Sequence, residues 1–117
     1  MVCVVANPQA KRLYSSYGIH AMQLMGRLIR QARLDKKITA QNLADRAAIS
    51  RTTLQKIENG DLTVEVGLVF EVAFIVGLKL FDLDESGISK KINQIDDRLA
   101  LMPKYARKPV KVIKDDF

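Results

Sequence analysis

Cysteine, histidine and tryptophan are nearly missing from this sequence, which has one cysteine, one histidine and no tryptophan among 117 residues. Cys3 has no second cysteine with which to form an internal disulfide. One cysteine and one histidine also cannot supply the ligands of a zinc site. Such sparing use of cysteine is typical of a reducing compartment, so we expect a cytoplasmic location.

Catalytic motifs are missing as well. The sequence has no Gly-rich phosphate loop, no paired histidines or cysteines, and no serine beside a candidate base in a known motif. Acidic residues gather at Asp82, Asp84 and Glu85, but they lack the glycine and the closing glutamate of a calcium loop. We therefore expect no enzyme, and no catalytic residue, metal or cofactor.

No apolar run is long enough for a membrane span. The run from Val66 to Phe81 has sixteen residues and includes Glu71 and Lys79, whereas a spanning helix needs about 18 to 20 uncharged ones. Near the N-terminus, the apolar run from Val2 to Ala6 is too short for a secretory signal, and its basic residues follow it. We expect a buried core helix in the first case and no membrane association.

The net charge of +6 is unevenly distributed. Residues 27–56 hold eight Lys or Arg against two acids, whereas residues 57–87 hold one against seven. Residues 88–117 hold eight against four, and residues 1–26 hold two without an acid. Positive charge at this density suits phosphate binding, which is mainly electrostatic and salt-dependent. Charge alone is weak evidence for DNA binding, so the argument for it depends on the pattern of residues within the basic region.

The segment Thr39 to Gly60 predicts two short helices joined by a tight turn. Thr39 and Ser50 are suited to cap the two helix starts, and Gly60 can take the left-handed conformation that ends a helix. Apolar residues recur at helical spacing and predict the buried side of both helices: Leu43, Ala44, Ala47, Leu54 and Ile57. Neither helix is long enough to be stable alone, so we expect them to pack on the rest of the domain.

The other face of the second helix carries Arg51, Thr52, Gln55 and Lys56. The major groove of DNA admits a helix, and these side chains match the donors and acceptors of base edges there. An ordinary helical hairpin with a solvated polar face is the alternative. We favour base reading because the apolar spacing, the capping residues and the exposed chemistry agree.

These residues resemble the Cro/C1 (XRE, lambda repressor-like) family of helix-turn-helix proteins over about Arg27 to Leu80. The matching positions are Leu43, Ala44, Ile49, Ser50, Leu54, Ile57, Glu58, Asn59 and Gly60. One departure is Ala48, which stands where the family usually has a glycine and would cost up to about 2 kcal/mol in a left-handed conformation.

The resemblance implies roles for individual residues. It places Arg51, Thr52 and Lys56, with Gln55 on the same face, at base edges, and it implies an ion pair between Arg33 and Glu58 beneath the motif. Contacts to DNA phosphates are expected from these residues: Lys37, Thr39, Gln41, Ser50, Thr53 and Asn59.

We expect an all-α protein: a five-helix Cro/C1-type helix-turn-helix domain with an extra C-terminal helix and flexible N- and C-terminal arms. The predicted divisions are an N-terminal arm (1–18), the DNA-binding domain (19–81), a connector with an amphipathic helix (82–102) and a basic extended tail (103–117). In the domain, the first helix runs from about Ile19 to Lys37, and a helix over Val64 to Val76 is capped by Thr63.

Three features suggest partners. The run Val2 to Val5 is a short strand with no evident partner in the chain, so it is either a frayed arm or pairs with a second copy. Phe70 and Phe74 form a stripe that favours a homodimer. The helix capped by Ser86 carries an apolar seam that packs on its own domain, on its symmetry mate or on another protein: Ile88, Ile92, Ile95, Leu99 and Met102.

The C-terminal sequence LALMPKYARKPVKVIKDDF, with RTTLQKIENGDLTVEVGLVFEVAFIVGLKLFD before it, resembles HipB-type regulators encoded beside HipA-type kinase toxins. This implies a bacterial antitoxin and autoregulatory repressor that binds an inverted-repeat operator as a dimer and holds a kinase through the seam or the tail. Phe117 is the expected anchor of the tail. The alternatives are an autonomous phage-type repressor, a restriction-modification controller, or an interaction module that does not bind DNA.

Overall fold

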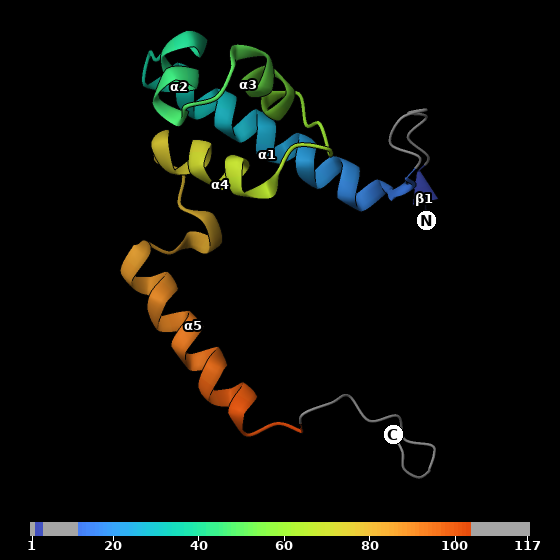
Figure 1. The fold of residues 1–117 in the computed structure, drawn as a ribbon, viewed down its shortest axis with the longest axis vertical. Coiled ribbons are helices and arrows are strands. Elements are labelled where there is room, and N and C mark those ends of the chain that lie inside the picture. The colour runs from blue at the N-terminus through green and yellow to red at the C-terminus, as the bar shows by residue number, and fades with distance from the viewer. Residues whose placement is uncertain (1, 4–11, 104–117) are drawn as a thin grey trace. The chain divides into compact units, whose positions relative to one another are not determined.

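The computed structural model describes residues 2–3 and 12–103, and the chain divides into two compact units, residues 1–80 and 81–117. The predicted tail, including Phe117, lies outside the described residues except for Pro103. The described helices are α1 (Ser16–Asp35), α2 (Ala40–Ala47), α3 (Arg51–Glu58), α4 (Val66–Ile75), the short 3-10 helix η1 (Leu80–Asp82) and α5 (Glu85–Ala100) (Figure 1).

The all-α class is confirmed. The first unit contains four described α-helices, and α5 in the second unit is the fifth, so the described part of the chain has one α-helix fewer than a five-helix domain with an extra helix would have. The segment after α4 forms η1 instead, and Phe81 within it has a positive φ of 60°, which interrupts a regular helix.

The N-terminal strand has a partner within the chain, contrary to our expectation. Strand β1 (Val2–Cys3) pairs antiparallel with β2 (Tyr14–Ser15), with Val2 opposite Ser15 and Cys3 opposite Tyr14. A two-residue strand is too short to show the alternation by which strands are recognised in sequence. Ser15 then caps α1, because its side chain accepts a hydrogen bond from the Gly18 amide at 3.1 Å, so α1 begins three residues before Ile19.

The core of the first unit lies where α1, α2, α3 and α4 meet. In this unit α3 packs against α1 and α2, and α2 packs against α4. Each helix contributes fully buried apolar residues: Ile29 from α1, Leu43 and Ala44 from α2, Leu54 and Ile57 from α3, and Val69, Val72 and Ala73 from α4, with Val76 just after it. Each large side chain buried in this way contributes about 1.5 to 3 kcal/mol.

Gly26 allows α1 to approach the end of α3 closely. A β-carbon at this position would lie 2.5 Å from the Ile57 carbonyl oxygen and 2.6 Å from that of Glu58. Both distances are well inside van der Waals contact, so only glycine fits here. Arg27, the next residue, donates from Nη1 to the Glu58 carbonyl at 3.2 Å and satisfies one of the open acceptors at the end of α3.

Two predicted helix caps are wrong. Thr63 does not cap α4. Its amide and hydroxyl both donate to Asp61 Oδ1, at 2.8 and 2.6 Å, and α4 begins after Glu65 without a side-chain cap. In the second unit, Asp84 rather than Ser86 caps α5, because Asp84 Oδ1 accepts from the Gly87 amide at 2.7 Å. In the second case two acceptors lie close together in the sequence, and the extended backbone at Asp84 selects that residue.

Candidate nucleic-acid interface

The helix pair α2 and α3 is joined by a three-residue turn, residues 48–50. Thr39 caps α2 by accepting from the Asn42 amide at 3.1 Å, and Ser50 caps α3 by accepting from the Thr53 amide at 3.0 Å. Both caps have the extended backbone typical of the position, with ψ of 157°. The start of each helix is therefore fixed by its own sequence, as the two capping residues predict.

The turn between the two helices passes through the left-handed region at Ala48, where φ is 57° and ψ is 41°. The Ile49 amide then donates to the Ala44 carbonyl at 3.0 Å, which closes the end of α2. The left-handed conformation expected of a glycine at this position is thus adopted by an alanine, at a cost of roughly 1 to 2 kcal/mol.

Arg33 and Glu58 form a bidentate ion pair beneath α3. Arg33 Nε donates to Glu58 Oε2 at 2.8 Å and Nη2 donates to Oε1 at 3.1 Å. The remaining guanidinium nitrogen, Nη1, donates to the Ile38 carbonyl at 3.1 Å. Both side chains are buried, so Arg33 connects the end of α1 to α3 and to the segment that leads into α2.

The outer face of α3 is free of such contacts. Arg51, Thr52, Gln55 and Lys56 are all exposed. None of the four makes a side-chain hydrogen bond or an ion pair with another described residue. Three lie in the first five residues of α3, at the end whose amide groups give the helix dipole its positive pole. The face that we predicted to read bases is therefore accessible, and a packed underside holds it.

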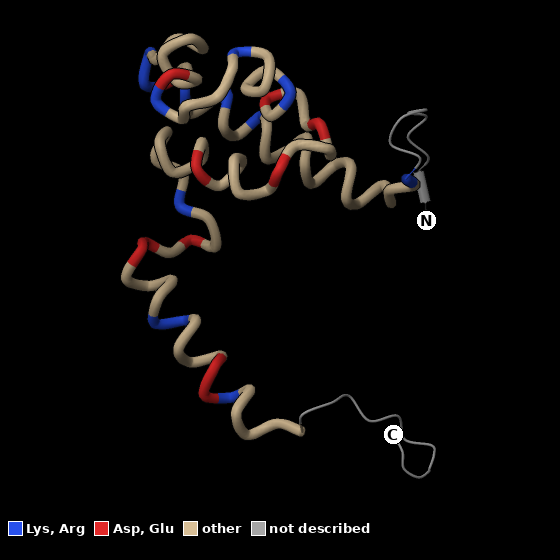
Figure 2. Tube along the Cα trace, viewed as in Figure 1, with Lys and Arg blue, Asp and Glu red and all other residues tan. Residues whose placement is uncertain are grey.

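The charge of α2 and α3 differs from that of α4. Figure 2 shows basic as well as acidic positions along α2 and α3, whereas the charged positions along α4 are acidic. Lys56 also lies within the field of Asp61. The pKa of Asp61 is lowered chiefly by the hydrogen bond from the Thr63 hydroxyl, then by that from the Thr63 amide, and to a smaller extent by Lys56, while burial opposes the shift. Asp61 is thus an anion beside the basic face at neutral pH. Its role was not predicted from the sequence, although the Asp-x-Thr pattern is a turn signal.

The expected phosphate ligands lie around this face with different donors available. Thr39 uses an oxygen lone pair for its cap and keeps its hydroxyl proton. Gln41 donates one side-chain amide hydrogen to Asp45 Oδ1 at 2.9 Å, and its second amide hydrogen is available to a phosphate. Ser50 donates its proton to Thr53 Oγ1 at 2.9 Å, which leaves the Thr53 hydroxyl proton as the donor of that pair. Asn59 and Lys37 are exposed.

Lys37 shares the backbone conformation of Ala48, with a φ of 57°. Its amide donates to the Leu34 carbonyl at 3.0 Å, and the Ile38 amide donates to the Arg33 carbonyl at 3.0 Å, which closes the end of α1. Lys37 therefore occupies a fixed backbone position just before the Thr39 cap, with an exposed side chain.

No three His, Cys, Asp or Glu side chains among residues 2–3 and 12–103 come together in a way that could hold a metal ion. None of the helices in this part of the chain combines the length and the apolar character that a membrane span requires.

The chain is similar to a known protein family. Residues 24–78 match a protein-family model described as a helix-turn-helix domain. The matched segment begins within α1, includes α2, α3 and α4, and ends shortly after α4. No protein of curated function matches the chain.

Proposed function

We propose that residues 24–78, which match a helix-turn-helix family model, form a domain of the Cro/C1 type, and that the chain is a sequence-specific DNA-binding repressor whose α3 enters the major groove. The supporting observation is the exposed face of α3, which presents Arg51, Thr52, Gln55 and Lys56 above a fully buried underside. Arg or Lys bidentate to guanine is the commonest specific contact in that groove. The phosphate contacts from Thr39 and its neighbours set the register of the helix on the duplex.

The test compares alanine substitutions at two basic residues of the protein, Arg51 and Lys37. We expect Arg51→Ala to lose about 1 to 3 kcal/mol of binding free energy, mostly at one base position, whereas Lys37→Ala weakens binding to all sequences alike. Fluorescence anisotropy would use the duplex upstream of the chain's own coding region and a scrambled duplex of equal composition. An equal loss on both duplexes for Arg51→Ala contradicts the base-reading role.

Salt dependence separates this function from a non-DNA-binding interaction module. Binding that neutralises phosphates must weaken steeply as salt rises, with a slope that shrinks by about one when one phosphate contact is removed. Undetectable or salt-independent binding would favour the interaction module.

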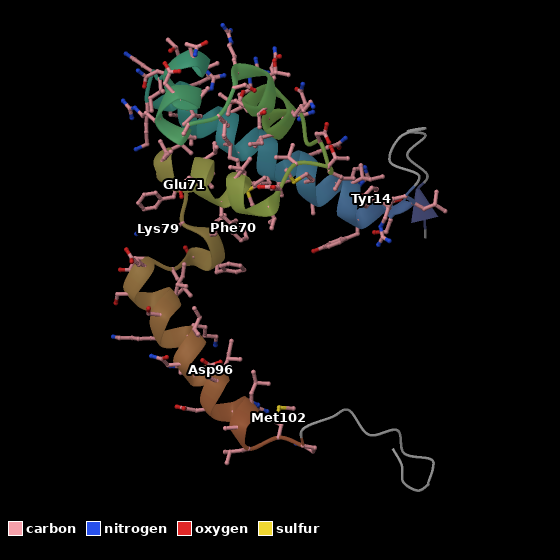
Figure 3. The ribbon with its side chains drawn as sticks, in the orientation of Figure 1. Tyr14, Phe70, Glu71, Lys79, Asp96 and Met102 are labelled. Carbon is pink, nitrogen blue, oxygen red and sulfur yellow. The ribbon has the colours of Figure 1, made fainter. Side chains whose placement is uncertain are left out.

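We also propose a homodimer that reads an inverted repeat, with half-sites about 34 to 36 Å apart. Val66, Phe70 and Phe74 follow one face of α4 at four-residue spacing and are 65%, 44% and 72% exposed. Phe70 is labelled on α4 in Figure 3. An apolar stripe of this kind is better covered by a second subunit than left in water. The dimer would be cytoplasmic and would associate with the bacterial nucleoid when bound to DNA.

More specifically, we propose that this repressor is an antitoxin that represses its own operon and binds a HipA-type kinase toxin. Its support is the resemblance of the C-terminal sequence, with Phe117 as anchor in the tail. Co-purification with the product of the adjacent gene, with and without residues 103–117, tests this directly. Loss of the kinase on truncation supports the tail contact. If the neighbouring gene encodes no kinase, an autonomous repressor or a restriction-modification controller is preferred.

A further inference from the structure

The apolar seam of α5 is exposed. Ile92, Ile95, Leu99 and Met102 are 52%, 47%, 57% and 51% exposed, and Ile88 continues the row toward the start of the helix. At 3.6 residues per turn the four positions within α5, Ile88 to Leu99, fall within roughly 60° of arc, and Met102 follows the end of the helix. Their spacing of four, three, four and three residues is that of alternating d and a positions of a heptad repeat. Among residues 81–103, α5 is the only α-helix, so whatever covers the seam lies outside that segment.

The charges beside the seam differ between its two edges. Lys91 and Arg98 follow one edge, at the g positions, and Asp96 lies on the other edge, at an e position with Ser89. Figure 3 labels Asp96 on α5 and Met102 just after the end of that helix. Solubility alone does not require basic and acidic residues to lie on opposite edges of an apolar row.

This separation selects one orientation of a helix pair. In a parallel pair, a g residue faces the e residue five positions later on the other helix, so Lys91 faces Asp96 of the second copy, twice by symmetry. In an antiparallel pair g faces g and e faces e, which sets Lys91 against Arg98 and leaves Asp96 without an opposite charge. Like charges across a helix interface are destabilising.

We propose that α5 pairs with α5 of a second copy of this chain as a parallel two-stranded coiled coil. Ile92 at position a is compatible with two strands, whereas isoleucine at position d, as at Ile88 and Ile95, favours more strands, so the number of strands follows from the proposed homodimer and not from the seam. Two heptads are marginal alone. The inference therefore rests on the proposed homodimer, because a subunit contact elsewhere raises the effective concentration of one α5 for the other.

A charge-reversal series on the full chain tests the pairing. Lys91→Asp converts both symmetric pairs into repulsive ones, and we expect the dimer dissociation constant to rise about tenfold, with the same effect for Asp96→Lys. The double variant Lys91→Asp/Asp96→Lys restores the wild-type constant to within about twofold. Sedimentation equilibrium at low salt measures this, because screening weakens exposed pairs.

Lys90→Asp and Asp97→Lys are the matched controls. They make the same changes in net charge one residue away, at the f positions on the side of α5 opposite the seam. Their dissociation constants should stay within about twofold of wild type. Equal effects at Lys90 and Lys91 would show a general charge effect and overturn the pairing.

Disulfide trapping tests the parallel orientation separately. In a Cys3→Ser background, Ile92→Cys and Leu99→Cys should each form a cross-linked dimer under mild oxidation, because equivalent a positions meet at the axis of a parallel pair within disulfide reach. Lys90→Cys at the outer position should not. In an antiparallel pair, at most one of the two seam positions can meet its own counterpart, so a cross-link at only one of them overturns the parallel arrangement.

The remaining outcomes separate this inference from the proposed function. Ile95→Asp should weaken the dimer and leave the melting temperature of the isolated monomer unchanged. A lower melting temperature without a change in association would mean that α5 packs on its own chain, which overturns the pairing while the DNA-binding role stands. Lys91→Asp should keep the wild-type affinity for a duplex that carries a single half-site. A chain that stays monomeric at high concentration defeats both the homodimer and the coiled coil.

Discussion

Two small residues of the first unit are under opposite constraints. Ala48 has a β-carbon in a left-handed conformation that glycine adopts without strain, whereas Gly26 lies where a β-carbon would overlap two carbonyl oxygens of α3. Ala48→Gly should therefore raise the free energy of unfolding and Gly26→Ala should lower it, although each substitution changes a single methyl group.

Ala48→Gly should raise the free energy of unfolding by about 1 kcal/mol, since relief of the left-handed strain exceeds the extra entropy of glycine in the unfolded chain. Urea denaturation followed by circular dichroism measures it. Ala47→Gly, one residue earlier and inside α2, is the matched control and should lower the free energy by up to about 1 kcal/mol. Stabilisation by both substitutions, or by neither, contradicts strain at Ala48 as the cause.

Gly26→Ala should lower the free energy of unfolding by about 1 to 3 kcal/mol, because α1 must move away from the backbone at the end of α3. The control is Gly67→Ala on α4, where an added β-carbon meets nothing within 4 Å. That change should stabilise the protein by up to about 1 kcal/mol through helix propensity. Thermal melts of the two variants should move in opposite directions, and a tolerated Gly26→Ala would mean that α1 does not need this close approach.

At the scale of elements, the orientation of α3 depends on a buried pair of charges as well as on apolar contacts. Glu58→Ala leaves the Arg33 guanidinium buried without its anion and should cost about 3 to 5 kcal/mol. Replacing both partners by apolar residues of similar size, as in Arg33→Met/Glu58→Leu, should recover most of that loss.

Equilibrium denaturation of the single and double variants measures the recovery. A double variant as unstable as Glu58→Ala would mean that the hydrogen bond from Arg33 to the Ile38 carbonyl, rather than the ion pair, supplies the stability.

The elements that the sequence predicts correctly are those whose ends are determined locally. Thr39, Ser50 and Gly60 mark the ends of α2 and α3 because each has one suitable role at its position, and Gly60 adopts a φ of 84°. The predicted start of α4 was wrong because no side chain caps that helix, and the predicted start of α5 was wrong because a second acceptor, Asp84, lies two residues before Ser86. The exposure of Arg51 and its neighbours follows from apolar spacing on the opposite side of the helix. Ala48 adopts the left-handed conformation of the family's turn glycine only with backbone strain. The close approach at Gly26 depends on the position of α3, which the sequence pattern around Gly26 does not reveal.

At the scale of the whole molecule, positive charge and apolar surface lie in different places. The basic region 27–56 contains α2 and α3, whereas the exposed stripe of Val66, Phe70 and Phe74 belongs to α4 in the acidic region 57–87. Separate surfaces for DNA and for a second subunit would allow both to bind at once. In that arrangement a substitution in the stripe should lower the affinity for a duplex with two half-sites and leave the affinity for a single half-site unchanged.

Phe74→Ser should therefore weaken self-association and lower the affinity for an inverted repeat, while the affinity for a single half-site stays unchanged. The reason is that the second half-site is bound at the effective concentration set by the subunit contact, so losing that contact removes the gain without touching the reading face. Phe81→Ser is the matched control, because Phe81 is 77% exposed and lies outside the stripe. Sedimentation velocity and anisotropy on full-site and half-site duplexes measure the two quantities. If half-site affinity falls as far as full-site affinity, Phe74 supports the fold of the domain rather than its dimer.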